Sequence, residues 1–493
     1  MIYMPRQLNS MKLSCLSVVI LLVGCADLNG LAPQGQLRSG QTIAASTSLA
    51  GVAPAPWPER DWWHGLGDAA LDTLIDEAMR DNPDLAAADA RVRLATAQAG
   101  SADAARYPTL DAKASFPGAP FPDDFPKPFA GYTSAKQANL TAGYTFDLWG
   151  GQRAAWEAAL GQQRAAEVDG EAARLTLSTR VAQTYGDLAY AFASHDIALA
   201  DLDRAQKLLE LTRQRVQAGI DSVALLRQAE STQASAEQKK AQTAQRVESV
   251  RTQLAVLLGQ GPDRGLSIVR PQALKASELA VPENLPAELV GRRPDIVAAR
   301  WRVDAARRSI DAAKAQFYPN VNLTAVFGVM SLKGADLLDS TSRFGLVTPA
   351  ISLPIFDGGR LRANLAERDA DYDLAVAQYN KALVGAFNEV ADSLSQLRSL
   401  ETQLAAQQRS LVGAQQAWEL STQRYRNGVG GYLEVLVLQQ ALHSAEDRLA
   451  DIENRRIAAS INLVRALGGG YRTDAPVALP SASPEVHAKA KES

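Results

Sequence analysis

Side chains that could perform chemistry are few in this chain and lie far apart. The 493 residues include four histidines and two cysteines. His64, His195, His443 and His487 lack the short spacings that hold a metal ion. The Gly-Leu-Gly segment that ends at Gly67 does not follow a predicted strand, so it does not predict a nucleotide-binding loop. We therefore predict no catalytic residue, no metal site and no enzyme activity.

One residue near the N-terminus could undergo a covalent modification. Arg6 and Lys12 precede a short apolar run, residues 16–23, which is too short to span a bilayer. This run ends in Leu-Val-Gly-Cys at Cys25, which resembles a bacterial lipobox, whose cysteine carries a diacylglycerol lipid after cleavage. We expect residues 1–24 to be a lipoprotein signal peptide and the lipid on Cys25 to be the only cofactor. An ordinary signal peptide with a chance cysteine is the alternative.

The composition is that of a globular protein that does not bind nucleic acid. Hydrophobic residues make up 46% of the chain and charged residues 21%, and the net charge is −3. No later segment has about 20 uninterrupted apolar residues, so we expect no transmembrane helix. Residues 25–56 are rich in Gly, Ser, Pro and Ala, which predicts a flexible leader, and residues 473–493 predict a disordered tail.

The body of the chain repeats itself once. Three pairs of motifs recur in the same order: Tyr107-Pro108 and Tyr318-Pro319, Phe146-Asp147 and Phe356-Asp357, and Gln214–Gly219 and Gln423–Gly428. The members of each pair lie about 210 positions apart, which indicates a duplicated domain-sized unit rather than a short solenoid repeat. We assign the first repeat to residues 57–277 and the second to residues 278–472.

Each repeat predicts two short strands and two long helices, after a shorter helix at about 67–106 or 287–316. The strands are expected at about 108–117, 137–147, 319–328 and 345–356. The long helices are expected at about 150–217, 221–258, 359–426 and 430–467. In the second strand, Leu140 and its alternate neighbours form an apolar face, and Asn139 and its alternate neighbours form a polar one. The fold class is therefore mainly α with a small β part.

Four strands cannot close a barrel by themselves, and an open sheet edge cannot face lipid. The strands either form a small soluble sheet or combine with those of other copies. Strands of about ten residues with one apolar face suit a transmembrane barrel, and three copies would supply about twelve of them, an even number. Long alanine-rich helices must bury their apolar stripes against similar helices, so three copies would also form a helical cylinder. A barrel that continues into such a cylinder is a conduit.

Five motifs carry a resemblance to a known family, and they are distributed over both repeats. They are Tyr144–Arg153, Arg292–Ile296, Ala315–Asn320, Leu353–Arg360 and Arg424–Gly428. Over residues 57–472 the chain resembles the TolC-like outer-membrane factors of bacterial efflux systems, in their NodT-type lipoprotein branch. The resemblance implies a homotrimer with a 12-stranded barrel in the outer membrane and a periplasmic α-helical barrel. It also implies passive export of small molecules delivered by a periplasmic adaptor and an inner-membrane pump of the resistance–nodulation–division type.

The resemblance also assigns roles to the helical hairpins. Gly219 and Gly428 interrupt the long helices at equivalent points, which would be the periplasmic tips that contact the adaptor. A plain helix–helix turn with a left-handed glycine is the alternative. Polar residues near these tips would hold the tunnel closed; the candidates are Arg213, Arg215, Arg424, Tyr425, Arg426 and Glu434. A solvated helical face is the alternative for these six residues.

Two other functions remain open from the residues. The outer-membrane duct of a type I protein secretion system would have the same tunnel. A structural periplasmic lipoprotein would have the long helices, but the alternating strands argue against it.

Overall fold

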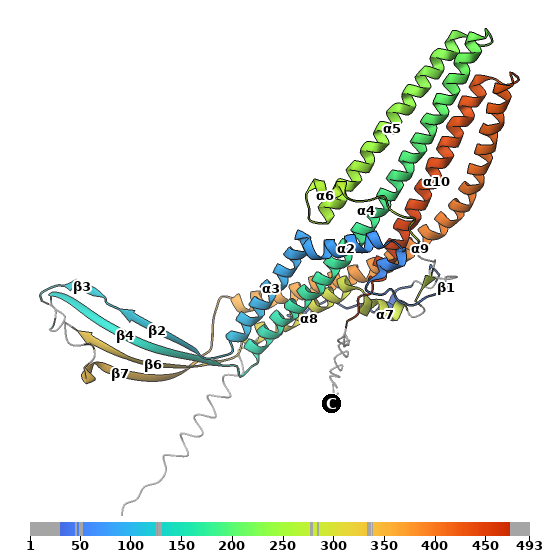
Figure 1. Ribbon diagram of the computed structural model, residues 1–493. Helices are drawn as coiled ribbons and strands as arrows, with labels where there is room; N and C mark the ends of the chain where they lie inside the picture. The colour runs from blue at the N-terminus through green and yellow to red at the C-terminus, as the bar shows by residue number, and fades with distance from the viewer. Residues whose placement is uncertain are drawn as a thin grey trace, which may run out of the picture. The chain divides into compact units, whose positions relative to one another are not determined.

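The computed structural model describes most of the chain (Figure 1). The described residues are 30–44, 47–48, 53–124, 126, 131–276, 280–282, 285–332, 337 and 339–473. The predicted signal peptide, Cys25 and the predicted tail from residue 474 lie outside them. The chain divides into two compact units. The first contains Met1–Leu37, Val92–Ala166 and Ala299–Tyr379, and the second contains Arg38–Arg91, Glu167–Ala298 and Asn380–Ser493.

The first unit contains an antiparallel sheet of five strands (Figure 1). The strands are β2 (Thr109–Ser115), β3 (Gly118–Phe121), β4 (Gly131–Phe146), β6 (Asn320–Leu332) and β7 (Arg343–Ser352). The order is β2-β4-β6-β7, and β3 also pairs with β4. The pairing of β4 with β6, in which Leu140 lies opposite Phe327, joins the hairpins of the two repeats into one sheet.

One face of this sheet is apolar across four strands. The register contains no bulge, so alternate residues keep to one face. The apolar face includes Leu110, Ala112, Ala114, Ala138, Leu140, Ala142, Tyr144, Phe146, Val321, Leu323, Ala325, Phe327, Val329, Val347, Pro349 and Ile351. In the single chain Leu140 is 49% exposed and Ile351 is 75% exposed. The alternation read from the sequence is therefore present, and the apolar face has no cover within the described residues.

Three strand ends differ from the predictions, and one of them is the end of β6, which was expected at about 328 and lies at Leu332. The prediction extended the last strand to residue 356, but β7 ends at Ser352, because its partner β6 begins at Asn320, directly opposite Ser352. The second strand was expected to begin at 137, and β4 already begins at Gly131, because pairing with β3 extends it. Among the described residues, no helix is long and apolar enough to cross a bilayer.

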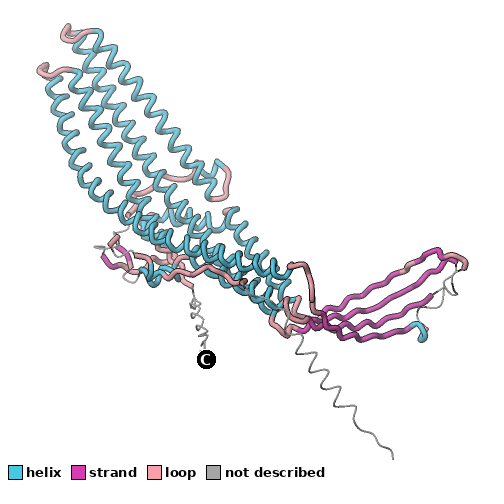
Figure 2. The backbone as a smooth tube through the Cα atoms, turned by 180° about the vertical axis from the view of Figure 1, so that it is seen from behind, coloured by secondary structure: helices cyan, strands magenta, loops and turns pink. Residues whose placement is uncertain are grey.

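Four long helices follow the strands, and Figure 2 shows them in cyan. They are α4 (Gly151–Gln217), α5 (Val223–Leu257), α9 (Arg360–Arg426) and α10 (Tyr432–Ala466). All these bounds lie within about two residues of the predicted ones, the usual difference at helix ends. A core in the second unit joins α4 to α5, and Tyr185, Leu188, Val250 and Leu254 are fully buried in it. The prediction of a mainly helical, duplicated fold with a small β part is confirmed.

The two shorter helices of the prediction are each broken once. The region 67–106 contains α2 (Ala69–Asp81) and α3 (Pro83–Ala104), and the region 287–316 contains α7 (Leu285–Arg292) and α8 (Pro294–Ala315). The break residue precedes a proline in both repeats, and proline disfavours helical backbone in the residue before it. Asn82 accordingly adopts an extended conformation, with φ −72° and ψ 126°. The predicted continuous helices are thus wrong at these two positions.

The break residues Asn82 and Arg293 perform equivalent tasks in the second unit. Asn82 Nδ2 donates to the carbonyl of Leu257 at 2.8 Å, near the end of α5. Arg293 Nη1 donates to the carbonyl of Ala466 at 3.1 Å, at the end of α10. Each residue therefore satisfies an unpaired carbonyl at a helix C-terminus.

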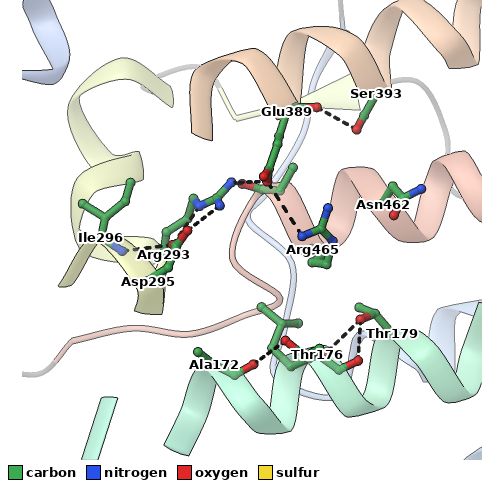
Figure 3. A network of polar contacts seen from close by, with 12 residues as sticks. Ala172, Thr176, Thr179, Arg293, Asp295, Ile296, Glu389, Ser393, Asn462 and Arg465 are labelled. Atoms are coloured by element: carbon green, nitrogen blue, oxygen red, sulfur yellow. Dashed lines mark hydrogen bonds and ion pairs between the residues drawn. The ribbon is translucent and has the colours of Figure 1, made fainter. Parts of the chain in front are cut away.

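Arg293 makes further contacts that Asn82 cannot make. It also pairs with Asp295 at 2.6 Å and with Glu389 of α9 at 2.9 Å (Figure 3). Its side chain is only 7% exposed. In the second repeat, one buried guanidinium therefore binds the start of α8, a residue of α9 and the end of α10.

The predicted flexible leader is wrong for part of its length. Within the first unit, the backbone amides of Gln34 and Gly35 donate to Asp373 Oδ1 at 2.8 and 2.6 Å. Leu31 packs against a small cluster that contains Leu365. Within the second unit, the amide of Arg38 donates to Asn380 Oδ1 at 2.8 Å. Side chains of α9 thus satisfy backbone donors that a solvated leader would leave to water, which composition alone could not indicate.

Candidate functional site

The tips of the two long hairpins have the same backbone geometry. Gly219 after α4 has φ +72° and Gly428 after α9 has φ +77°. The amide of the following residue donates back to Arg215 O at 2.9 Å in the first tip and to Arg424 O at 3.0 Å in the second. A helix C-terminus of this kind needs a left-handed residue, which glycine adopts without strain. Both glycines therefore form the predicted turns, and their contact with an adaptor stays a prediction.

A polar network in the second unit joins the two tips. Arg215 Nε donates to Asp221 Oδ2 at 2.8 Å, and Arg215 Nη2 donates to Asp221 Oδ1 at 3.2 Å. The Tyr425 hydroxyl donates to Asp221 Oδ2 at 2.5 Å. Arg215 Nη1 also donates to the carbonyl of Tyr425 at 2.9 Å. Two residues of the α4 tip thus hold one residue of the α9 tip by two hydrogen bonds.

The aromatic ring of Tyr425 is the centre of a small core beneath this network. Tyr425 is 1% exposed, and the Arg215 guanidinium lies over its ring, 4.4 Å from the centroid. Tyr432, which begins α10, meets the Tyr425 ring edge-on at 5.8 Å between centroids. Leu208, Leu209 and Val435 complete the core. The network is therefore supported by apolar packing that fixes the ring of Tyr425.

The charges of the network favour its ionised form. The hydrogen bonds from Arg215 lower the pKa of Asp221, and the hydroxyl of Tyr425 acts in the same direction. Burial raises the pKa of Tyr425, so its hydroxyl keeps the proton that it donates. The side chains of Arg215 and Asp221 are 12% and 9% exposed, but they lie at the end of a hairpin with little protein beyond them. Water is therefore close, and the pair contributes about 1 kcal/mol, as surface pairs do, rather than the larger energy of a deep pair.

The other predicted gate residues do not join this network. Arg213 pairs on its own helix with Glu210 at 2.8 Å. Arg424 and Glu434 approach to 3.9 Å, and their side chains are 51% and 45% exposed. Arg426 is exposed, with no hydrogen bond or ion pair in the described part of the chain. Of the six candidates, only Arg215 and Tyr425 thus belong to the network, and the other four have the solvated surroundings of the alternative. The gate role stays a prediction for all six.

The sequence analysis missed Asp221, which is the acceptor for both other members of the network. A signal was present in the sequence. Asp221 follows the tip glycine, Gly219, by two positions, and Arg215 precedes Asp221 by six positions. Where the chain reverses direction after a helix, residues on the two sides of the turn come to lie next to each other. The spacing alone could not indicate that Tyr425, about 200 positions further on, would share the same carboxylate.

Comparisons with known proteins agree with this architecture. A family model described as outer membrane efflux protein matches residues 74–260 and 285–469, one match in each repeat. The fusaric acid resistance protein FusA of Burkholderia cepacia is 36% identical over 373 residues, which cover 74% of this chain and 70% of FusA. The multidrug resistance outer membrane protein MdtP of Escherichia coli K12 is 30% identical over 480 residues, which cover 95% of this chain and 98% of MdtP.

A solved structure gives the same result in three dimensions. The outer membrane protein VceC of Vibrio cholerae superposes with a TM-score of 0.78 at 36% sequence identity, over 84% of this chain and 100% of VceC. The fold is that of the trimeric TolC-like outer-membrane channels. The chain therefore belongs to the outer membrane efflux protein family, and it is a channel protein of the outer membrane.

Proposed function

We propose that three copies of this chain form the outer duct of a tripartite efflux complex, through which small toxic molecules leave the cell passively. An inner-membrane pump of the resistance–nodulation–division type and a periplasmic adaptor would deliver the substrate. The names of FusA and MdtP, which refer to fusaric acid resistance and multidrug resistance, support a small-molecule substrate. A structural lipoprotein without a channel does not agree with the family.

The observation that carries the proposal is the link between the two hairpin tips. Asp221 and Arg215 hold Tyr425 through hydrogen bonds of 2.5 to 2.9 Å. In this arrangement the second hairpin is fixed to the first, and we infer that this link keeps the duct closed. Each contact contributes only about 1 kcal/mol, so docking of a partner can supply the energy to open the link.

Apolar side chains around the tips support contact with an adaptor. Ile220 and Val429, the residues after the two turn glycines, are 63% and 68% exposed. Leu433 is 72% exposed at the start of α10. Large exposed apolar residues close together indicate a protein contact surface, so Gly219 and Gly428 would place these side chains against the adaptor.

The lipid anchor is a separate part of the proposal. Cys25, modified with a diacylglycerol and an additional acyl chain, would attach the leader to the outer membrane. The observation in support is the docking of residues 31–38 against α9, which fixes the chain soon after the cysteine. Replacement of Cys25 by serine should abolish incorporation of radiolabelled palmitate, and unchanged incorporation would contradict the anchor.

The duct is tested by conductance and by drug susceptibility. Purified protein in planar bilayers should form pores of low conductance, and the Asp221→Asn variant should form pores of clearly higher conductance. Arg213→Gln is the matched control, because it removes a charge from the same helix turn without touching the network. A strain that lacks the gene should regain drug tolerance with the wild type. Restored secretion of a protein, without a change in tolerance, would instead favour the type I secretion duct.

A further inference from the structure

The apolar face of the sheet ends in two basic residues. On β4, Lys136 lies opposite Ser331 of β6, and on β7, Arg343 lies opposite Val329 of β6. Lys136 is an even number of residues from Leu140, so its side chain belongs to the apolar face. The same alternation places Arg343 on that face, and both side chains are exposed. The two cations thus mark one edge of a face that is otherwise apolar.

This edge is the one that lies away from the helices. β4 ends at Phe146, shortly before α4 begins at Gly151, and its other end at Gly131 points away from the helices (Figure 1). Lys136 is five residues from Gly131. Lys136 and Phe146 are about ten residues apart, or about 34 Å along an extended strand. A strand tilt of about 40° reduces this to about 26 Å, close to the height of about 25 Å of the apolar band of an outer-membrane barrel. The rings of Tyr144 and Phe146, 4.9 Å apart, lie at the opposite edge.

Neither cation has a charged partner among the residues that the structure describes. Within the described residues, Lys136 and Arg343 form no ion pair, and the described strands contribute no acidic side chain to this face. Strand β6 lies between the two residues, and their partners on it, Ser331 and Val329, are two positions apart. Their Cα atoms are therefore about 12 Å apart. Their long side chains can therefore reach the same headgroup on the lipid side of the sheet.

We propose that Lys136 and Arg343 bind the phosphate groups of lipopolysaccharide in the outer leaflet. This inference rests on the proposed orientation of the barrel, with the helices in the periplasm. The outer leaflet then meets the sheet at the level of the two cations. The headgroup of its main lipid is a glucosamine disaccharide with two phosphates, which matches two basic residues about 12 Å apart. The contact anchors the outer rim of the barrel in the membrane.

Binding is tested with the full-length trimer in detergent. The lipopolysaccharide that copurifies is quantified by its 3-hydroxy fatty acids per mole of protein, and the Kd of delipidated trimers for purified lipopolysaccharide is measured. The variant carries Lys136→Gln and Arg343→Gln. A basic residue near an anionic lipid surface contributes about fivefold, so the double variant should bind about 30-fold more weakly. Lys113→Gln is the matched control, because Lys113 lies opposite Asn139 on the polar face.

Further arms identify the chemical group that binds. Dephosphorylated lipid should bind weakly and equally to the wild type and the double variant. Phosphatidylglycerol should bind the wild type more weakly than lipopolysaccharide does, because one phosphate per lipid cannot bridge both cations. The variant with Lys136→Arg and Arg343→Lys should bind as the wild type does. If the double Gln variant does not assemble, the two single variants, each expected to lose about fivefold, replace it.

Two results would overturn the inference. One is a double variant that binds lipopolysaccharide as tightly as the wild type, and the other is a Lys113→Gln control that loses as much affinity. Conductance in planar bilayers shows whether only the lipid site is wrong or the proposed duct is wrong as well. If the variants still form pores, the lipid site alone is wrong; if the wild type forms none, the proposed duct is wrong as well.

Discussion

The hydroxyl of Tyr425 donates to Asp221 Oδ2 at 2.5 Å, which connects the last turn of α9 to the tip that follows α4. The two residues belong to different repeats. The same carboxylate also accepts from Arg215, so one acidic side chain holds both hairpin tips. If the duct is closed in this way, a substitution that removes one hydrogen-bonding group from the network should raise its conductance.

Removal of one hydroxyl should open the duct. Tyr425→Phe keeps the ring in its core but deletes the donor to Asp221, at a cost of about 1 kcal/mol to the closed state. We expect a higher single-channel conductance in planar bilayers, with unchanged trimer migration on gels. Tyr432→Phe is the control, because that ring contacts Tyr425 but does not bind Asp221. Equal conductance of Tyr425→Phe and the wild type would argue against the link.

Acid should open the duct through Asp221. The pKa of this carboxyl is lowered by Arg215, so the link is fully present above the ordinary carboxyl pKa of about 3.9 and is lost as the pH falls through the lowered value. Conductance should stay constant from about pH 7 to pH 5 and rise below about pH 4. Asp221→Asn should be insensitive to pH, whereas Glu434→Gln should keep the response. A response that survives in Asp221→Asn would assign it to another group.

The tip glycines should tolerate no side chain. Gly219 and Gly428 have φ of +72° and +77°, where a Cβ costs about 1–2 kcal/mol. Gly219→Ala and Gly428→Ala should each lower the free energy of unfolding by about this amount in urea titrations. Gly431 has φ −88° and open space around its Cα, so Gly431→Ala is the control and should be nearly neutral. A loss for Gly431→Ala as large as the other two would contradict the assignment of the cost to the left-handed backbone conformation.

The buried Arg293 should matter more than the exposed Arg465, although both contact Glu389. Arg293 is 7% exposed and also binds Asp295 and a helix-end carbonyl. Arg293→Ala removes the ion-pair partner of Asp295 and the donor to the Ala466 carbonyl, and it should cost about 3 kcal/mol. Arg465 is 40% exposed and 3.9 Å from Glu389, so Arg465→Ala should change stability by less than about 0.5 kcal/mol. Thermal unfolding of both variants measures the difference, and similar transition temperatures would refute the assignment.

The faces of the sheet can be tested by cysteine labelling. Leu140 and Asn139 are adjacent on β4 and lie on opposite faces, the first among apolar and the second among polar residues. In intact cells, a membrane-impermeant thiol reagent should label Asn139→Cys through the pore and leave Leu140→Cys unlabelled in lipid. Labelling of both to the same extent would contradict the assignment of the two faces.

Much of the fold is readable from the sequence because its signals are local. The period of two around Leu140 predicted a strand with an apolar face. The turn glycines at 219 and 428 were predicted because only their own backbone conformation is involved. The helix breaks were placed less well, since the helical pattern of apolar residues continues across them.

The sequence by itself determined the duplication, the long helices, the alternating strands and the family. The tertiary structure alone decided that β4 pairs with β6, that the leader docks against α9, and that Asp221 accepts from both Arg215 and Tyr425. The physical reason is the range of the interactions. Periodicity and turn chemistry act between near neighbours in the chain. The β4–β6 pairing, the docking of the leader and the Tyr425–Asp221 contact join residues that are about 175 or more positions apart, and they depend on how the elements pack.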